Sequence, residues 1–156
     1  MVQNGLVYNE TSEFRVIKTA PATLVSVQQS TRHSQNGMPM HHENGFIKIM
    51  PSQGGEPAKV TASYTHIFGM NEFEFGEMTA EKLTLQTNAE SHFQRPNPAQ
   101  VTSEEAKSNL VTKIVREYTC VEPGKIAFTV HMGQGGREPV LHLQGELSRV
   151  EEGGSS

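Results

Sequence analysis

The chain is a succession of short runs in which apolar and polar side chains alternate. The clearest run is residues 71–75, in which Phe73 and Phe75 share one face. Glu72 and Glu74 lie between them and share the other face. A period of two residues is typical of β-strands whose faces meet different surroundings. Comparable runs occupy residues 13–19, 23–32, 45–50, 59–68, 82–87, 110–118 and 126–132, and a last run follows Pro139.

Turn signals separate these runs and indicate the fold class. Ser34–Gly37 contains an Asn-Gly pair, Glu122–Gly124 contains Pro-Gly, and Gly133–Gly136 is rich in glycine. Such residues tolerate the backbone conformations of tight hairpin turns. Closely spaced strands without a helical period predict an antiparallel all-β fold. A barrel is favoured because it leaves no exposed sheet edge.

Residues 94–109 interrupt the strand pattern. Pro96 and Pro98 predict a loop. The stretch Thr102–Glu105 resembles a capping box, the arrangement that begins many helices. One helical turn and an irregular loop both remain open for this stretch.

Composition narrows the class of protein. At 156 residues the chain fits one domain, which we place at 1–150, with a disordered tail at 151–156. A net charge of −4 gives no basic surface for nucleic acid, and no apolar run is long enough to span a membrane. The N-terminus lacks the apolar core of a signal peptide, and the single cysteine, Cys120, excludes an internal disulfide. We therefore expect a cytoplasmic protein.

Seven histidines offer the main candidate chemistry. Only His41 and His42 are adjacent, and neighbours on a strand point to opposite faces, so their spacing does not predict zinc. The chain has no Gly-x-Ser-x-Gly turn for a nucleophilic serine and no phosphate-binding Gly-x-x-x-x-Gly-Lys motif. Haem needs only one strong axial ligand and an apolar wall. Candidates for such a wall are Met38, Met40, Met132, Phe68 and Leu141.

His142 lies two residues into the strand that follows the glycine-rich turn. Strict alternation places it opposite Leu141 and Leu143, so it faces solvent if the leucines face the interior. A bulge after Pro139, or a ligand seated at the barrel mouth, would relieve this conflict. The residues alone therefore predict a β-barrel but do not identify its ligand.

Five stretches, in order along the chain, resemble the nitrobindin family. The stretch Pro39-Met-His-His-Glu-Asn-Gly-Phe46 is similar to the family's Pro-Met-His-x-Glu-x-Gly-Phe/Tyr motif. The spacing from Met132 to His142 also agrees with the family. The other four stretches are Glu13–Val16, Thr65–Gly76, Ile114–Tyr118 and Val130–Leu143.

The resemblance implies an antiparallel barrel of about ten strands, similar to lipocalins and fatty-acid-binding proteins, that binds ferric haem b in an open cleft. By this resemblance His142 would be the axial ligand of the iron, and Met40 and His41 would lie on the distal side. Met132 would pack beside the porphyrin, and His66 would line the cavity. Members of the family convert peroxynitrite to nitrate and bind nitric oxide.

The chain departs from the family at its N-terminus. The family's first strand carries a Gly-x-Trp-x-Gly-x-Gly motif, whereas residues 1–8 have no such motif and the chain has no tryptophan. We therefore expect a barrel that lacks this strand or is open at one seam, where a homodimer could form. His66 also stands where relatives usually carry an amide.

Two other functions stay open. The barrel could carry a fatty acid or another apolar ligand without haem, and a basic residue inside it would then meet the carboxylate. Arg116 is the candidate, because it shares strand parity with Ile114 and Tyr118. The chain could also be an interaction domain that pairs its open edge with a partner strand.

Overall fold

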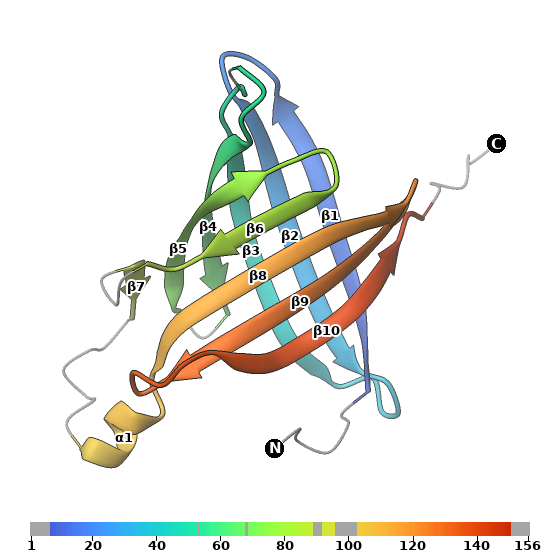
Figure 1. Ribbon diagram of the computed structural model, residues 1–156. Coiled ribbons are helices and arrows are strands. Elements are labelled where there is room, and N and C mark those ends of the chain that lie inside the picture. Colours follow the sequence, from blue (N-terminus) through green and yellow to red (C-terminus); the bar gives the residue numbers. More distant parts are fainter. Residues whose placement is uncertain (1–6, 53, 68, 89–91, 96–102, 151–156) are drawn as a thin grey trace.

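The computed structural model describes residues 7–52, 54–67, 69–88, 92–95 and 103–150. These residues form ten antiparallel strands and one short helix (Figure 1). The elements are β1 (Tyr8–Lys18), β2 (Thr23–His33), β3 (Pro39–Ile49), β4 (Ala58–His66), β5 (Asn71–Met78), β6 (Lys82–Gln86), β7 (Phe93–Gln94), α1 (Glu104–Ser108), β8 (Val111–Glu122), β9 (Lys125–Gln134) and β10 (Val140–Ser148).

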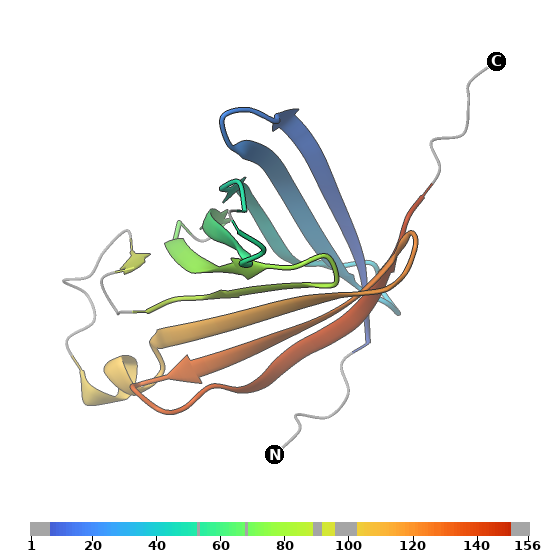
Figure 2. The same ribbon diagram turned by 45° about the horizontal axis from the view of Figure 1, so that its top comes forward.

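The strands form one twisted sheet that curls into a barrel. Its spatial order is β1-β2-β3-β4-β5-β6-β8-β9-β10, and β7 pairs with β5. In Figure 1, β1 to β5 form one wall and β6, β8, β9 and β10 cross it as a second wall. Figure 2 shows the two walls around a common interior. The predicted fold class, an antiparallel all-β barrel of about ten strands, is confirmed.

The barrel is nearly closed and has a seam between β1 and β10. These two strands are the ends of the strand order and do not pair with each other in the described part of the chain. They meet where the Tyr8 hydroxyl donates to the Gln144 carbonyl oxygen at 3.3 Å. The open seam expected from the sequence is therefore present.

Two apolar clusters hold the walls together by removing their side chains from water. One cluster joins β2, β3, β4 and β6, and the other joins β7, β8 and β9 with the β4–β5 turn. Leu85, at the centre of the first, is fully buried. The clusters consist of Val27, Ile47, Val60, Ala62, Tyr64 and Leu85, and of Met70, Phe93, Ile114, Tyr118, Phe128 and Val130.

Three elements refine the boundaries predicted from the sequence. β3 begins at Pro39 rather than Gly45, because the preceding residues also pair with β2. Phe93–Gln94 forms the short strand β7, at the start of the predicted loop. α1 shows that the stretch after Ser103 takes the helical alternative, and the Lys107 amide donates to the Ser103 carbonyl at 3.0 Å. Thr102, Pro96, Pro98 and the tail 151–156 lie outside the described residues.

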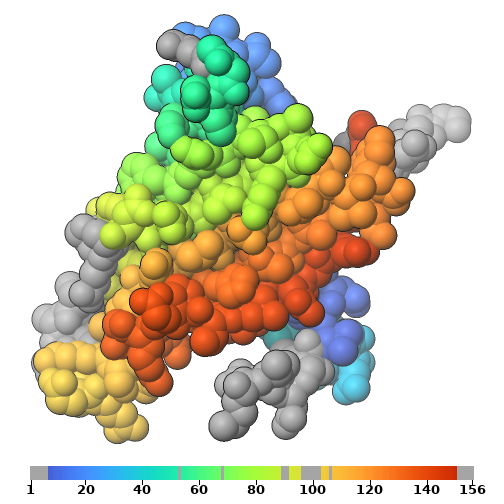
Figure 3. Space-filling model, viewed as in Figure 1, coloured from blue at the N-terminus to red at the C-terminus, as the bar shows by residue number. Residues whose placement is uncertain are grey.

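α1 lies beside the β9–β10 turn (Figure 3). Arg137 Nη2 donates to the Ser108 carbonyl at 3.0 Å, and the Gly135 amide donates to the Leu110 carbonyl at 2.8 Å. A cavity of about 740 Å³ lies here, and none of the residues predicted to contact haem lines it. Among the described residues, no helix is long and apolar enough to cross a membrane.

Candidate functional site

β5 turns its charged face toward the barrel interior. Glu72 and Glu74 are fully buried, whereas Phe73 and Phe75 on the opposite face are each 38% exposed. The predicted alternation between two faces of β5 is therefore confirmed, but a period of two does not show which face lies inside the barrel. Glu72 and Glu74 can be buried because they bind a cation within the barrel, Arg116.

Arg116 on β8 binds carboxylates from two other strands. Its Nη1 and Nη2 donate to the two oxygens of Glu43 on β3, at 2.8 and 3.1 Å. Nη2 also donates to Glu72 Oε1 at 2.6 Å, and Nε donates to Glu74 Oε1 at 2.9 Å. The guanidinium lies 4.6 Å from the centre of the Tyr64 ring. The planar fork of arginine suits this arrangement, because each of its three nitrogens finds an acceptor.

The three carboxylates differ in protonation state. Burial opposes ionisation of Glu43, but the charge of Arg116 and the hydrogen bonds from His41 and Arg116 lower its pKa to about 2. Burial also opposes ionisation of Glu72, and Arg116 and His66 together lower its pKa. For Glu74 burial dominates, and the neighbouring Glu72 helps to raise its pKa to about 8. Glu43 and Glu72 are therefore ionised at neutral pH, and most Glu74 is protonated.

Gly45 makes room for the aromatic ring that covers Arg116. Gly45 and Tyr64 face each other across β3 and β4. A Cβ atom at position 45 would lie 2.7 Å from Tyr64 Cδ1 and still closer to the Ser63 carbonyl oxygen. Any other residue would displace the ring, so this glycine is part of the construction of the cluster.

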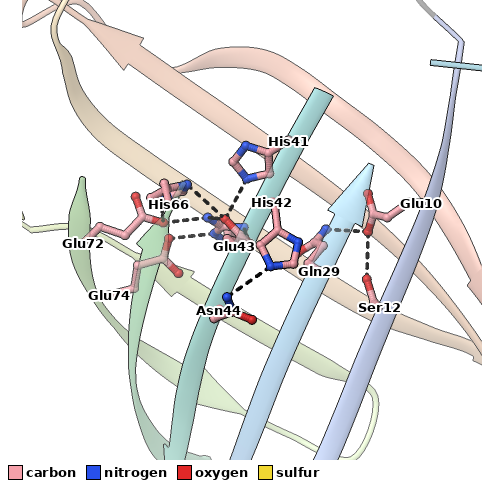
Figure 4. Close-up of polar contacts among 11 residues, drawn as sticks. Glu10, Ser12, Gln29, His41, His42, Glu43, Asn44, His66, Glu72 and Glu74 are labelled. Atoms are coloured by element: carbon pink, nitrogen blue, oxygen red, sulfur yellow. Dashed lines mark hydrogen bonds and ion pairs between the residues drawn. The ribbon is translucent and has the colours of Figure 1, made fainter. Parts of the chain in front are cut away.

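Two histidines border the cluster (Figure 4). His66 is buried on β4, with Nδ1 3.5 Å from Glu43 Oε2 and Nε2 3.4 Å from Glu72 Oε1. His41 precedes Glu43 by two residues, so both face the interior. Its Nε2 lies 3.1 Å from Glu43 Oε2, and the centres of the two imidazole rings are 5.1 Å apart. His42 lies on the other face of β3 and contacts Asn44 instead.

Two β-bulges lie at the end of the barrel where these histidines are found. The register of β3 against β2 slips at Met40, and that of β10 against β9 slips at His142. Each of these residues is therefore skipped in the described pairing of its strand. Bulges at barrel rims redirect side chains. The bulge considered from the sequence is therefore present in β10, but His142 remains exposed on the side of Gln144 and Glu146, as strict alternation predicted.

His142 combines access to solvent with a neutral side chain. Its side chain is exposed, yet enough atoms surround it that burial lowers its pKa, and the positive charge on His41 lowers it further. The two imidazoles therefore lie within electrostatic range of each other at the end of the barrel where β3 and β10 begin, which we call the opening. A neutral imidazole is the form that binds a metal ion.

The other residues predicted to contact haem lie on strand ends around the same opening. Met132 is half-buried near the end of β9, and Leu141 is 47% exposed near the start of β10. Met40 is 37% exposed, and Met38, just before β3, is 59% exposed. Phe68 lies outside the described residues.

Sequence reasoning assigned no function to the three glutamates. Glu43 could have been noticed because it follows His41 at the spacing that shares a strand face. Arg116 does lie inside the barrel, as parity predicted. It is already bound by carboxylates of the protein, so it offers a fatty acid no ready partner and the apolar-carrier alternative loses its main support.

A nearly closed antiparallel barrel with an accessible histidine at one opening defines a class of small ligand-binding β-barrels. The chain matches the family model described as "THAP4-like, heme-binding beta-barrel domain" over residues 4–149. The chain therefore belongs to this family of heme-binding β-barrel domains, and the resemblance to nitrobindins is confirmed.

Individual relatives agree with this assignment. The chain is 31% identical over 117 residues to a peroxynitrite isomerase of Frankia alni, covering 74% of this chain and 70% of that protein. It is 30% identical over 121 residues to a peroxynitrite isomerase of Parafrankia sp., covering 72% of this chain but only 51%, about half, of the relative. The crystal structure of Rv2717c from M. tuberculosis shares the fold, with a TM-score of 0.68 and 23% identity over 92% of this chain and 81% of that one.

Proposed function

We propose that this chain binds ferric haem b at the opening of the barrel, where β10 begins, with His142 as axial ligand, and converts peroxynitrite to nitrate there. Nitric oxide would be a further ligand of the same site. The observation that carries the proposal is the neutral, solvent-accessible imidazole of His142 at a bulge beside the opening. Membership of a heme-binding family and the peroxynitrite isomerases among the relatives support it.

A porphyrin bound at the opening would cover apolar side chains that are exposed without it. Met38, Met40 and Leu141 expose 59, 37 and 47% of their surface. A flat apolar ring would remove these side chains from water, and the flexible methionines would adapt to its surface. His142 would supply the one protein ligand that haem requires.

When bound, haem would supply a ferric ion that acts as Lewis acid and electron partner for a small oxidant. His142 would hold the group from its position at the bulge in β10. Its lowered pKa keeps the coordinating nitrogen free of a proton in more acidic solution than an ordinary histidine would allow.

His41 would meet a ligand from the other side of the opening. Ionised Glu43 only accepts hydrogen bonds, so the Nε2–H of His41 donates to Glu43 Oε2. Nδ1 is then an acceptor in neutral His41 and a donor to an anion once the ring is protonated. Arg116 fixes the carboxylate of Glu43 and so the direction of the His41 ring.

The proposal is tested by titrating the haem-free chain with hemin and recording the absorption spectrum. The wild type should bind one equivalent and show a Soret band. His142→Ala should weaken the binding at least about tenfold or shift the band, because the axial ligand is lost. His131→Ala is the matched control, since His131 lies on the neighbouring strand opposite Leu141. It should behave as wild type.

Peroxynitrite decay, followed by stopped-flow absorption, tests the reaction itself. Haem-loaded wild type should accelerate decay to nitrate, and His142→Ala should lose the acceleration that exceeds that of free hemin. Identical spectra and decay rates in the wild type and His142→Ala would remove His142 from this role.

A further inference from the structure

The structure assigns a second metal site, distinct from the haem ligand His142, to His41, Glu43 and His66 inside the barrel. We propose that these three residues bind one divalent transition-metal ion of the zinc or ferrous iron type. Two histidines and one carboxylate are a donor set that both ions accept, with positions left for water or substrate. The proposal does not depend on haem binding, although both would use His41.

The donor atoms already have the spacing of a coordination shell. His41 Nε2 is 3.1 Å from Glu43 Oε2, and His66 Nδ1 is 3.5 Å from the same oxygen. Ligands held about 2.1 Å from a metal lie about 3.0–3.5 Å from each other in octahedral or tetrahedral geometry. The three donor groups all lie within 4.8 Å of one another. An ion could therefore enter with small side-chain shifts.

A second layer of contacts supports the three ligands. Metal-binding histidines usually give their other ring nitrogen to a carboxylate, and ligating carboxylates are themselves hydrogen-bonded. His66 Nε2 lies 3.4 Å from Glu72 Oε1, and Arg116 Nη1 donates to Glu43 Oε1 at 2.8 Å. Arg116 Nη2 reaches the proposed ligand atom Glu43 Oε2 at 3.1 Å, which leaves that oxygen one further lone pair. Glu43 and His66 are thus oriented before an ion arrives, whereas His41 must release its Nε2 proton, or move it to Nδ1, to bind the ion.

Charge and an unused acceptor favour a cation at this place. The carboxylates of Glu43 and Glu72 both face the single guanidinium of Arg116, and protonated Glu74 adds no charge, so one negative charge stays uncompensated. Glu72 is fully buried, and its Oε2 has no hydrogen-bond partner in the described residues. A water molecule on the ion could donate to it. The side chain of His41 is 35% exposed, so one of the three ligands is reached from solvent.

The spacing of the histidines along the chain does not predict this site. His41 and Glu43 are two residues apart, but His66 joins them only because β3 and β4 pair in the register that sets Glu43 opposite His66.

The test is calorimetric titration of the haem-free, chelator-treated full chain with Zn²⁺, and absorption spectroscopy with Co²⁺ as a coloured substitute. We expect one ion per chain and Co²⁺ bands typical of nitrogen and oxygen ligands. His41→Ala should weaken the affinity at least about tenfold. His42→Ala is the matched control, because His42 is the adjacent histidine on the opposite face of β3. It should leave the affinity unchanged.

His142→Ala separates this proposal from the proposed function. It should lose the haem signature and keep Zn²⁺ affinity at the wild-type level. The proposal is overturned if the wild type shows no saturable binding at micromolar protein, if His41→Ala binds as tightly as wild type, or if His42→Ala loses binding to the same extent. Circular dichroism of each variant checks that the barrel is folded, and His41 is exposed enough to be replaced without opening the core.

Discussion

Glu43 and Glu74 are the same side-chain type beside the same arginine, yet their charges differ. Glu43 accepts two hydrogen bonds from Arg116 and a third from His41, whereas Glu74 accepts one, from Arg116 Nε. Each hydrogen bond to a carboxylate favours its charged form, and burial favours the neutral form. Glu74 therefore keeps its proton because it is buried with fewer donors and lies beside the charge of Glu72.

Glu74 should make the stability of the fold depend on pH. Its folded-state pKa of about 8 exceeds the ordinary value of 4.5, so the folded chain holds this proton more tightly than the unfolded chain. The resulting stabilisation is complete below pH 4.5 and is lost as pH rises through 8. Glu74→Gln keeps an acceptor for Arg116 and cannot ionise, so its free energy of unfolding should fall less between about pH 5 and 9.

Urea unfolding at several pH values measures this difference. Glu43 and Glu72 have lowered pKa values, so their stabilisation is present above pH 4.5 and lost on acidification in wild type and variant alike. Glu117→Gln, which removes an exposed ion pair with Lys82, is the control and should retain the wild-type slope. A parallel pH dependence in Glu74→Gln and wild type would show that Glu74 does not hold the proton.

At the scale of strands, the sequence predicted the positions of most elements but not the direction in which every side chain faces. Alternation located nearly every long strand, because each wall meets core on one side and water on the other. It also placed His142 correctly on the exposed side with Gln144 and Glu146, and the residue that departs from the alternation at the bulge is Leu141, which is exposed although Leu143 is half-buried. It could not orient β5, whose buried glutamates follow from a partner on β8.

Gly45 offers a test of how β3 supports the cluster. Gly45→Ala should lower the free energy of unfolding by about 1–3 kcal/mol, because the added methyl group overlaps the Tyr64 ring and the Ser63 carbonyl. Asn44→Ala, at the neighbouring exposed position, should change it by no more than about 0.5 kcal/mol. Chemical denaturation compares the two. Equal stability of Gly45→Ala and Asn44→Ala would mean that the ring moves without cost.

At the scale of the whole molecule, the seam is the most accessible place for another chain. β1 is an edge strand, and its Val16 and Ile17 are 58 and 51% exposed. Unpaired edges with exposed apolar residues tend to pair with other strands. We therefore predict a concentration-dependent homodimer in sedimentation velocity, which Val16→Lys should abolish. Val121→Lys alters a valine of similar exposure on β8 and should not. A monomer at all concentrations would contradict this use of the edge.

The sequence predicted only part of the candidate site, because the residues of the site lie far apart along the chain. The stretch Pro39–Phe46 drew attention because it resembles a known motif, and its His41 and Glu43 do belong to the cluster. Arg116 is 73 residues from Glu43 and 42 from Glu74. No local pattern links such residues, and only the curl of the sheet brings them together.

The cluster around Arg116 also constrains how this chain can change over generations. Loss of the arginine alone leaves buried carboxylates without a counter-charge, and loss of Glu43 alone leaves a buried cation short of partners. Such a first step costs about 3–5 kcal/mol, a large share of the roughly 5–15 kcal/mol that keeps a domain folded. Descendants should therefore inherit Glu43, Glu72, Glu74 and Arg116 as a set, or exchange them together for an apolar interior.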